Sequence, residues 1–149
     1  MAHFPTMLNY KIKHAIDTES IPTILQFIYQ GNFLAIGSES TVTVLETETG
    51  VAVSKLTAEG NILCLQSSKV ENAMYCGYQG GLFLKLTISG KVLVADGFTA
   101  FKCALVAIAA HHSDCLLALG GRDDAESDDI VQIWRRKDQH SKNTLHKQC

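Results

Sequence analysis

Short apolar runs separated by polar turns follow one another along most of the chain. Residues 41–45 alternate hydroxyl-bearing and aliphatic side chains, a period of two that predicts a strand with one face in water. Similar runs precede and follow this segment, each ending at glycine or at a polar turn. About eleven strands are expected, at 22–29, 33–36, 41–45, 51–56, 62–66, 73–76, 81–86, 91–94, 104–109, 115–119 and 130–134. The chain is therefore predicted to be all-β, with no helix longer than two turns.

The strand pattern repeats about every forty residues. Gly37 and Gly77 are 40 residues apart, and Gly77 and Gly120 are 43 apart. Leu25 falls on Leu65 in the same superposition. A period in the forties that is built from strands is typical of β-propeller blades. We therefore expect the three glycines to occupy equivalent places in the second strands of successive blades.

The period divides the chain into an arm, three blades and a tail. The expected boundaries are an N-terminal arm at 1–20, blade one at 21–60, blade two at 61–102, blade three with an acidic hairpin at 103–137, and a basic polar tail at 138–149. Blade three offers three strands, so its outer strand is predicted to be missing. The alternating segment 7–13 is the candidate in this chain for that position. Three blades do not close a ring, so the two end blades are expected to expose apolar faces.

This arrangement resembles the WD40 repeat family. The local match is carried by residues 116–121, followed by Ile130-Val131-Gln132-Ile133-Trp134. Family members commonly end the third strand in Trp-Asp, whereas this chain has Trp134-Arg135, and the Gly-His pair that often opens a repeat is absent. The resemblance covers residues 21–137 and implies a partial propeller of about three four-stranded antiparallel blades. A β-sandwich also fits short strands at regular spacing.

The resemblance implies a non-catalytic scaffold for protein–protein interaction. The closing unit, with its charged hairpin, is also similar to the last blade of C-terminal propellers in Roco-type kinases and some Rho exchange factors. That likeness implies an alternative, a C-terminal regulatory segment of a larger signalling protein. Further blades encoded beside this sequence would distinguish an excised segment from a whole protein.

Composition narrows the class of protein. With 149 residues, 46% of them apolar and 19% charged, the sequence fits one globular domain. A net charge of −2 provides no positive field for nucleic acid. The charge is unevenly placed, at −4 over residues 122–129 and +4 over residues 135–147. Two solvated surface segments are the expected outcome.

The cysteines and the apolar segments indicate a cytoplasmic protein. Five cysteines occur without the close pairs of a zinc site or the density of a disulfide scaffold. The N-terminus shows no basic start followed by an apolar run, so a signal peptide is not expected. The most apolar stretch, 103–119, is interrupted by His111, His112 and Asp114, which argues against membrane insertion.

Two metal sites can be considered and neither is expected. Asp124, Glu126 and Asp128 alternate as in a calcium loop, but the glycine and the distant glutamate of an EF-hand are absent. The acidic hairpin is predicted to be mobile and metal-free. His111 and His112 lie near Cys115, yet adjacent side chains on an extended chain point to opposite sides.

No enzyme chemistry is predicted either. Ser113 and Asp114 follow His112, but the sequence lacks a glycine-bracketed elbow for a nucleophile. Gly77, Gly80 and Gly81 lie in an expected hairpin rather than between a strand and a helix, so they do not form a phosphate loop. We expect no enzyme and no cofactor.

Surface recognition remains as the expected activity. Tyr78 and Gln79 lie at a glycine-rich hairpin tip, and Arg122, Asp123 and Asp124 begin the charged hairpin. These five residues are the candidate partner-binding positions. The expected partners are proteins, with self-association or docking onto further propeller blades as additional possibilities.

Overall fold

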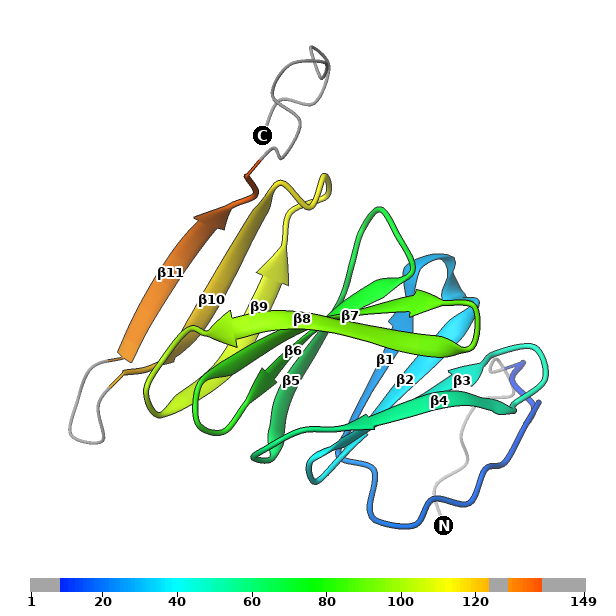
Figure 1. Cartoon of the computed structure of the whole chain (residues 1–149). Helices are drawn as coiled ribbons and strands as arrows, with labels where there is room; N and C mark the ends of the chain where they lie inside the picture. Colours follow the sequence, from blue (N-terminus) through cyan, green and yellow to red (C-terminus); the bar gives the residue numbers. More distant parts are fainter. Residues whose placement is uncertain (1–8, 124–128, 138–149) are drawn as a thin grey trace, which may run out of the picture.

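Three antiparallel sheets stand side by side in the computed structural model, which describes residues 9–123 and 129–137 (Figure 1). The first sheet, blade one, comprises β1 (Ile24–Ile28), β2 (Phe33–Ser38), β3 (Thr41–Glu46) and β4 (Ala52–Thr57). Blade two comprises β5 (Ile62–Ser67), β6 (Ala73–Tyr78), β7 (Leu82–Ser89) and β8 (Val92–Thr99). Blade three comprises β9 (Ala104–Ala110), β10 (Leu116–Arg122) and β11 (Asp129–Arg135). Within the described residues the fold is all-β, and the only helix is the 3-10 turn Tyr29–Gly31.

The repeat predicted from the sequence is confirmed by the strand register. Gly37 pairs with Val42 across β2 and β3, Gly77 pairs with Phe83 across β6 and β7, and Gly120 pairs with Val131 across β10 and β11. Each glycine therefore occupies the same place in the second strand of its blade. The arrangement of four, four and three strands fits a partial β-propeller.

The core lies between the blades, where sheet faces pack against one another. One cluster joins blade one to blade two, with Val42 and Val44 against Leu65, Met74 and neighbouring side chains. A second cluster joins blade two to blade three through Tyr75, Phe83, Phe101, Leu105 and Leu119. Every blade therefore buries a face by means of its neighbour.

The outer edge of blade three also packs against blade two. The ring of Trp134 on β11 lies 4.7 Å from that of Phe98 on β8, centroid to centroid, and Phe98 lies 5.0 Å from Phe83. In the described part of the chain β11 is the outermost strand of its sheet, so the expected three-stranded blade is found. Among the same residues no helix is long and apolar enough to cross a bilayer.

The described part of the arm, residues 9–20, does not supply a strand to blade three. Residues 9–13 form no strand, and the arm runs beside blade one instead; Met7 and Leu8 lie outside the described residues. Lys13 Nζ lies 2.8 Å from Glu48 Oε2, and His14 Nε2 lies 2.8 Å from the Glu48 carbonyl oxygen. Placing a strand at 7–13 beside β11 is therefore wrong for the described positions, because polar contacts hold the arm at the turn between β3 and β4.

Candidate interaction surfaces

Five turns and linkers from the three blades meet along one edge of the molecule, the lower edge in Figure 1. We call this edge the hairpin rim, and it consists of residues 39–40, 60–61, 79–80, 102–103 and 122–123. Backbone hydrogen bonds join these segments in order: Ile62 N to Glu39 O (2.7 Å), Gln79 N to Asn61 O (2.8 Å), Gly80 N to Cys103 O (2.7 Å) and Cys103 N to Arg122 O (3.1 Å). The rim is thus one continuous surface on a hydrogen-bonded framework, although its segments are far apart in sequence.

Three of the predicted partner-binding residues lie together on the hairpin rim. Gln79 is exposed and forms a bridge with Ala104, which in turn pairs with Arg122. Arg122 Nε donates to Asp129 Oδ1 at 3.1 Å, and Asp123 Oδ1 accepts from the backbone N–H of Lys102 at 3.0 Å. Asp124 lies outside the described residues. The fold therefore brings together two candidate segments, at Gln79 and at Arg122, that lie 43 residues apart in the sequence.

The prediction of an exposed Tyr78 is wrong. Its side chain is 0% exposed and belongs to the cluster between blades one and two. The hairpin is as predicted, with Gly81 N donating to Tyr78 O at 3.0 Å and positive φ at both Gly80 and Gly81. The exposed tip begins one residue later, at Gln79, because Tyr78 still belongs to β6.

The polar turn between β9 and β10 stabilises the contact between blades two and three. Asp114 is 3% exposed, and its carboxyl group accepts hydrogen bonds from the Ser68 hydroxyl, from Tyr75 Oη at 2.9 Å and from the Lys69 backbone N–H at 3.0 Å. Burial, reinforced by the neighbouring Asp114, raises the pKa of Tyr75. Asp114 therefore joins blade three to blade two and does not orient a histidine. Ser113 Oγ instead lies 3.0 Å from His111 Nδ1.

The described residues of the rim do not include a group of side chains that could bind a metal ion. Across residues 9–123 and 129–137, no three His, Cys, Asp or Glu side chains gather in a group that could hold an ion. The acidic residues 124, 126 and 128, considered above for calcium, lie outside those ranges. No metal centre is thus assigned to the described surface.

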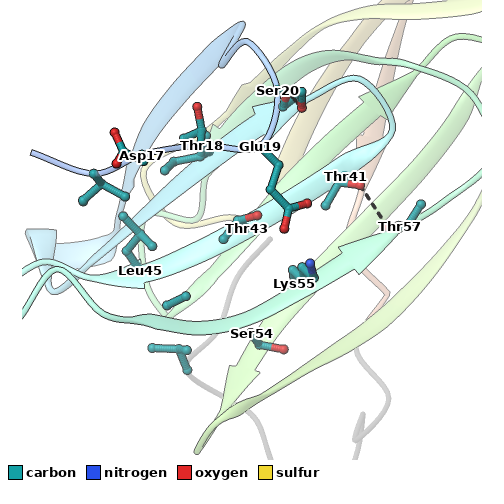
Figure 2. Close-up of a pocket in the computed structure, with 15 residues that line it drawn as sticks. Asp17, Thr18, Glu19, Ser20, Thr41, Thr43, Leu45, Ser54, Lys55 and Thr57 are labelled. Atoms are coloured by element: carbon teal, nitrogen blue, oxygen red, sulfur yellow. Dashed lines mark hydrogen bonds between the residues drawn. The ribbon is translucent and has the colours of Figure 1, made fainter.

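A groove of about 600 Å³ lies on the face of blade one that is turned away from blade two (Figure 2). The arm, over residues 16–20, forms one wall, and β3 and β4 form the floor. Hydroxyl groups dominate its polar lining, which also includes Asp17, Glu19 and Lys55: Thr18, Ser20, Ser38, Thr41, Thr43, Ser54 and Thr57. The hydroxyls of Thr41 and Thr57 bond to each other at 2.9 Å.

Two cysteines of blade two are held in the protonated form. Burial raises the pKa of the Cys64 thiol to about 11, and burial also raises the pKa of Cys76. Cys64 Sγ lies 3.7 Å from the carbonyl oxygen of Leu105 and acts as a donor to it. Because the thiolate is the reactive form of cysteine, both side chains are poor nucleophiles at neutral pH.

Stability is expected to fall above pH 9, and Cys64 contributes to that fall. Below pH 9.0, the ordinary pKa of a cysteine thiol, Cys64 keeps its proton in both the folded and the unfolded chain. Its contribution to the free energy of unfolding is then fully present. Between pH 9 and about pH 11 the unfolded chain loses this proton first, which favours unfolding. Urea midpoints measured across that interval should decline less steeply in Cys64→Ala than in the wild type. Equal slopes would contradict the assignment.

Comparison with known proteins supports the architecture. A chain in the crystal structure of the mitotic checkpoint complex superimposes with a TM-score of 0.64 at 18% sequence identity. The match covers 76% of this chain and 37% of that one, so this chain spans well under half of its structural neighbour. No family model and no curated protein matches the sequence. At this identity the likeness shows the fold alone.

Proposed function

We propose that this chain is a non-catalytic protein–protein interaction scaffold of the WD40 type, with the hairpin rim as its partner-binding surface. The observation that carries the proposal is the continuity of the rim, on which exposed side chains from three blades share one hydrogen-bonded edge. Loops fixed by rigid strands are well suited to recognition, because little conformational entropy is lost when a partner binds. The structural neighbour, a chain within a protein complex, supports protein partners as a class.

The rim offers both charge signs. Arg122 and Asp123 lie at one end, Gln79 is in the middle, and Glu39 lies at the other end. The ion pair between Arg122 and Asp129 is exposed, with 51% and 76% of the two side chains accessible, so a partner can compete for either member at small cost. A protein surface with a matching arrangement of charges and amides is the expected ligand. We place this scaffold in the cytoplasm, in keeping with the free thiols of Cys64, Cys76 and Cys103.

The alternative function, a regulatory segment of a larger protein, would use the hairpin rim for contacts within one chain. In that arrangement the rim would contact the rest of a larger signalling protein, such as a Roco-type kinase or a Rho exchange factor. Interaction within one chain and interaction between chains are separated by testing whether the isolated 149 residues capture a partner.

Affinity capture with matched variants tests the proposal. Tagged wild type, a Gln79→Ala/Arg122→Ala double variant and a Lys91→Ala control are compared in the same lysate. Lys91 is exposed at the far end of the β7–β8 hairpin, away from the rim, because β7 runs from the rim to that turn. We expect at least one protein to be enriched by wild type and control, and to be reduced about tenfold or more by the double variant. Identical profiles for all three would contradict a rim-based scaffold.

A further inference from the structure

Successive blades meet at similar contacts, in which the second-strand glycine of one blade faces a leucine on the first strand of the next. A methyl group built on Gly37 of blade one would lie 3.5 Å from Leu65 Cδ1 of blade two. A methyl group built on Gly77 of blade two would lie 2.7 Å from Leu105 Cγ of blade three. Gly77 lets the sheet backbones approach closely, whereas Gly37 leaves room for ordinary contact, and both leucines are buried. Both joints therefore pack a second-strand glycine against a leucine, although Leu65 pairs with Cys76, the residue before Gly77, and Leu105 pairs with Gly121, the residue after Gly120.

The two halves of a third such contact are present and unpaired. Gly120, the equivalent of Gly37 and Gly77, lies on an open face: among residues 9–123 and 129–137, a methyl group built there would have only atoms of Ala107, from its own blade, within 4 Å. Leu25, the equivalent of Leu65, is 60% exposed on β1. Blade three therefore presents the glycine side of a joint, and blade one presents the leucine side.

The side chains around Gly120 extend the equivalence. Val42 and Val44 of blade one are both 0% exposed against blade two. By strand register their equivalents in blade three are Val131, which pairs with Gly120, and Ile133, which pairs with Ala118. Val131 is 73% exposed and Ile133 is 75% exposed. Apolar β-branched residues grouped on one sheet face in this way mark an association surface.

The part of blade one around Leu25 is exposed, as contact with Gly120 of another copy would require. On the far face of blade one the arm and its groove lie over the outer strands, and Ile36 and Leu45 are buried. Leu25 and Phe27, on the inner strand β1, remain 60% and 57% exposed. The part of this face that would meet Gly120 is therefore left uncovered.

We propose that two copies of this chain pair head to tail, with the Gly120 face of each copy packed on the Leu25 face of the other. The occupant is a second copy because one chain carries both halves of the joint that it already uses twice internally. A reciprocal pair would satisfy all four open faces and give a closed ring of six blades, within the range of about four to eight seen in propellers. This pairing is independent of the hairpin rim and of the scaffold role.

Sedimentation equilibrium of the full chain tests the pairing. Between about 1 μM and about 100 μM, the mass should rise from that of one 16.3 kDa chain toward twice that value. Ile133→Glu, on the glycine side, and Leu25→Asp, on the leucine side, should each weaken pairing at least about tenfold. Val92→Asp is the control, because Val92 is similarly exposed, at 60%, but lies on β8 away from both faces.

Mixing the two disruptive variants separates head-to-tail from face-to-face pairing. The Leu25→Asp copy keeps its Gly120 face and the Ile133→Glu copy keeps its Leu25 face, so the mixture retains one intact joint. We expect the mixture to pair more tightly than either variant alone. A wild type that stays monomeric over the whole range would overturn the proposal. Undiminished pairing in Leu25→Asp would overturn it as well, since the Leu25 face would then lie outside the interface.

Cross-linking gives a readout that does not depend on disruptive substitutions. Val131→Cys, at the exposed position paired with Gly120, and Leu25→Cys are prepared as separate proteins and treated with a short bismaleimide, alone and mixed. The mixture should give cross-linked pairs above the background that the native cysteines produce in wild type. Cross-linking of the mixture no stronger than that of either protein alone would contradict the proposed joint.

Discussion

Asp114→Ala should lower the free energy of unfolding by about 4 kcal/mol, because it removes the acceptor for three hydrogen bonds at the joint between blades two and three. The hydroxyls of Ser68 and Tyr75 and the Lys69 backbone N–H all donate to this carboxyl group, which is 3% exposed. Alanine leaves those donors without their partner in a buried setting. It also places a side chain without polar atoms at a φ of 56°, a left-handed conformation that asparagine and aspartate tolerate better.

Two further variants test whether the loss of unfolding free energy in Asp114→Ala comes from the buried hydrogen bonds. Asp114→Asn keeps an acceptor oxygen and suits the same backbone conformation, so about half of the loss should be recovered. Asp129→Ala removes an aspartate that pairs with Arg122 on the surface, and it should cost less than about 1 kcal/mol. Urea unfolding of all three variants, beside the wild type, provides the measurement. If Asp114→Ala were as mild as Asp129→Ala, the buried joint would not contribute to stability.

The strands could be predicted because their signals are local. Alternation with a period of two and a closing turn are both readable within six to ten residues. Each expected strand is found, most of them with ends shifted by three residues or fewer, but the strand expected at 91–94 extends to Thr99. The equivalence of Gly37, Gly77 and Gly120 was predictable for the same reason, since the repeat brings the same local pattern back. Register across a hairpin then follows from the position of the turn.

The roles of Tyr78 and Asp114 could not be predicted, because both depend on contacts with another blade. Tyr78 precedes a glycine-rich turn, and its burial is decided by the side chains of blade one. Asp114 lies in a polar turn that suggests a solvated loop. Its partners Ser68 and Tyr75 are 46 and 39 residues away in the sequence, and only blade packing brings them together.

The arm shows how polar contacts can override a weak strand pattern. Alternation over 7–13 is compatible with an edge strand, but a single edge strand gains little burial by itself. The described part of the arm instead follows blade one, where Lys13 and His14 meet Glu48 and the hydroxyls of Ser20 and Ser38 lie 2.5 Å apart. No signal within the arm identifies those partners, which belong to another part of the chain.

Gly77→Ala is expected to destabilise the protein by about 3 kcal/mol, whereas Gly120→Ala should leave stability unchanged or raise it by up to about 1 kcal/mol. Both glycines lie at the same register position in the second strand of their blades. They differ in whether another blade packs against them. A methyl group on Gly77 would stand 2.5 Å from Cys64 Sγ and 2.8 Å from the Leu105 carbonyl oxygen, a backbone atom that cannot move without shifting β9. On Gly120 the same group would make an ordinary contact, 3.6 Å from Ala107 Cβ.

Intrinsic strand preference acts in the opposite direction, so it cannot produce the expected difference. Alanine is more favourable than glycine within a strand by roughly 0.5–1 kcal/mol, and that gain should apply equally at both positions. Gly37→Ala adds a third point, with contacts of 3.5 Å to Ile62 and Leu65 that a methyl group can make without clash, so its effect should be close to that of Gly120→Ala. Urea midpoints at one fixed protein concentration rank the three variants. Equal stability of Gly77→Ala and Gly120→Ala would mean that blades two and three are less closely packed than the Gly77–Leu105 contact requires, and the glycine–leucine joint would lose its best-defined example.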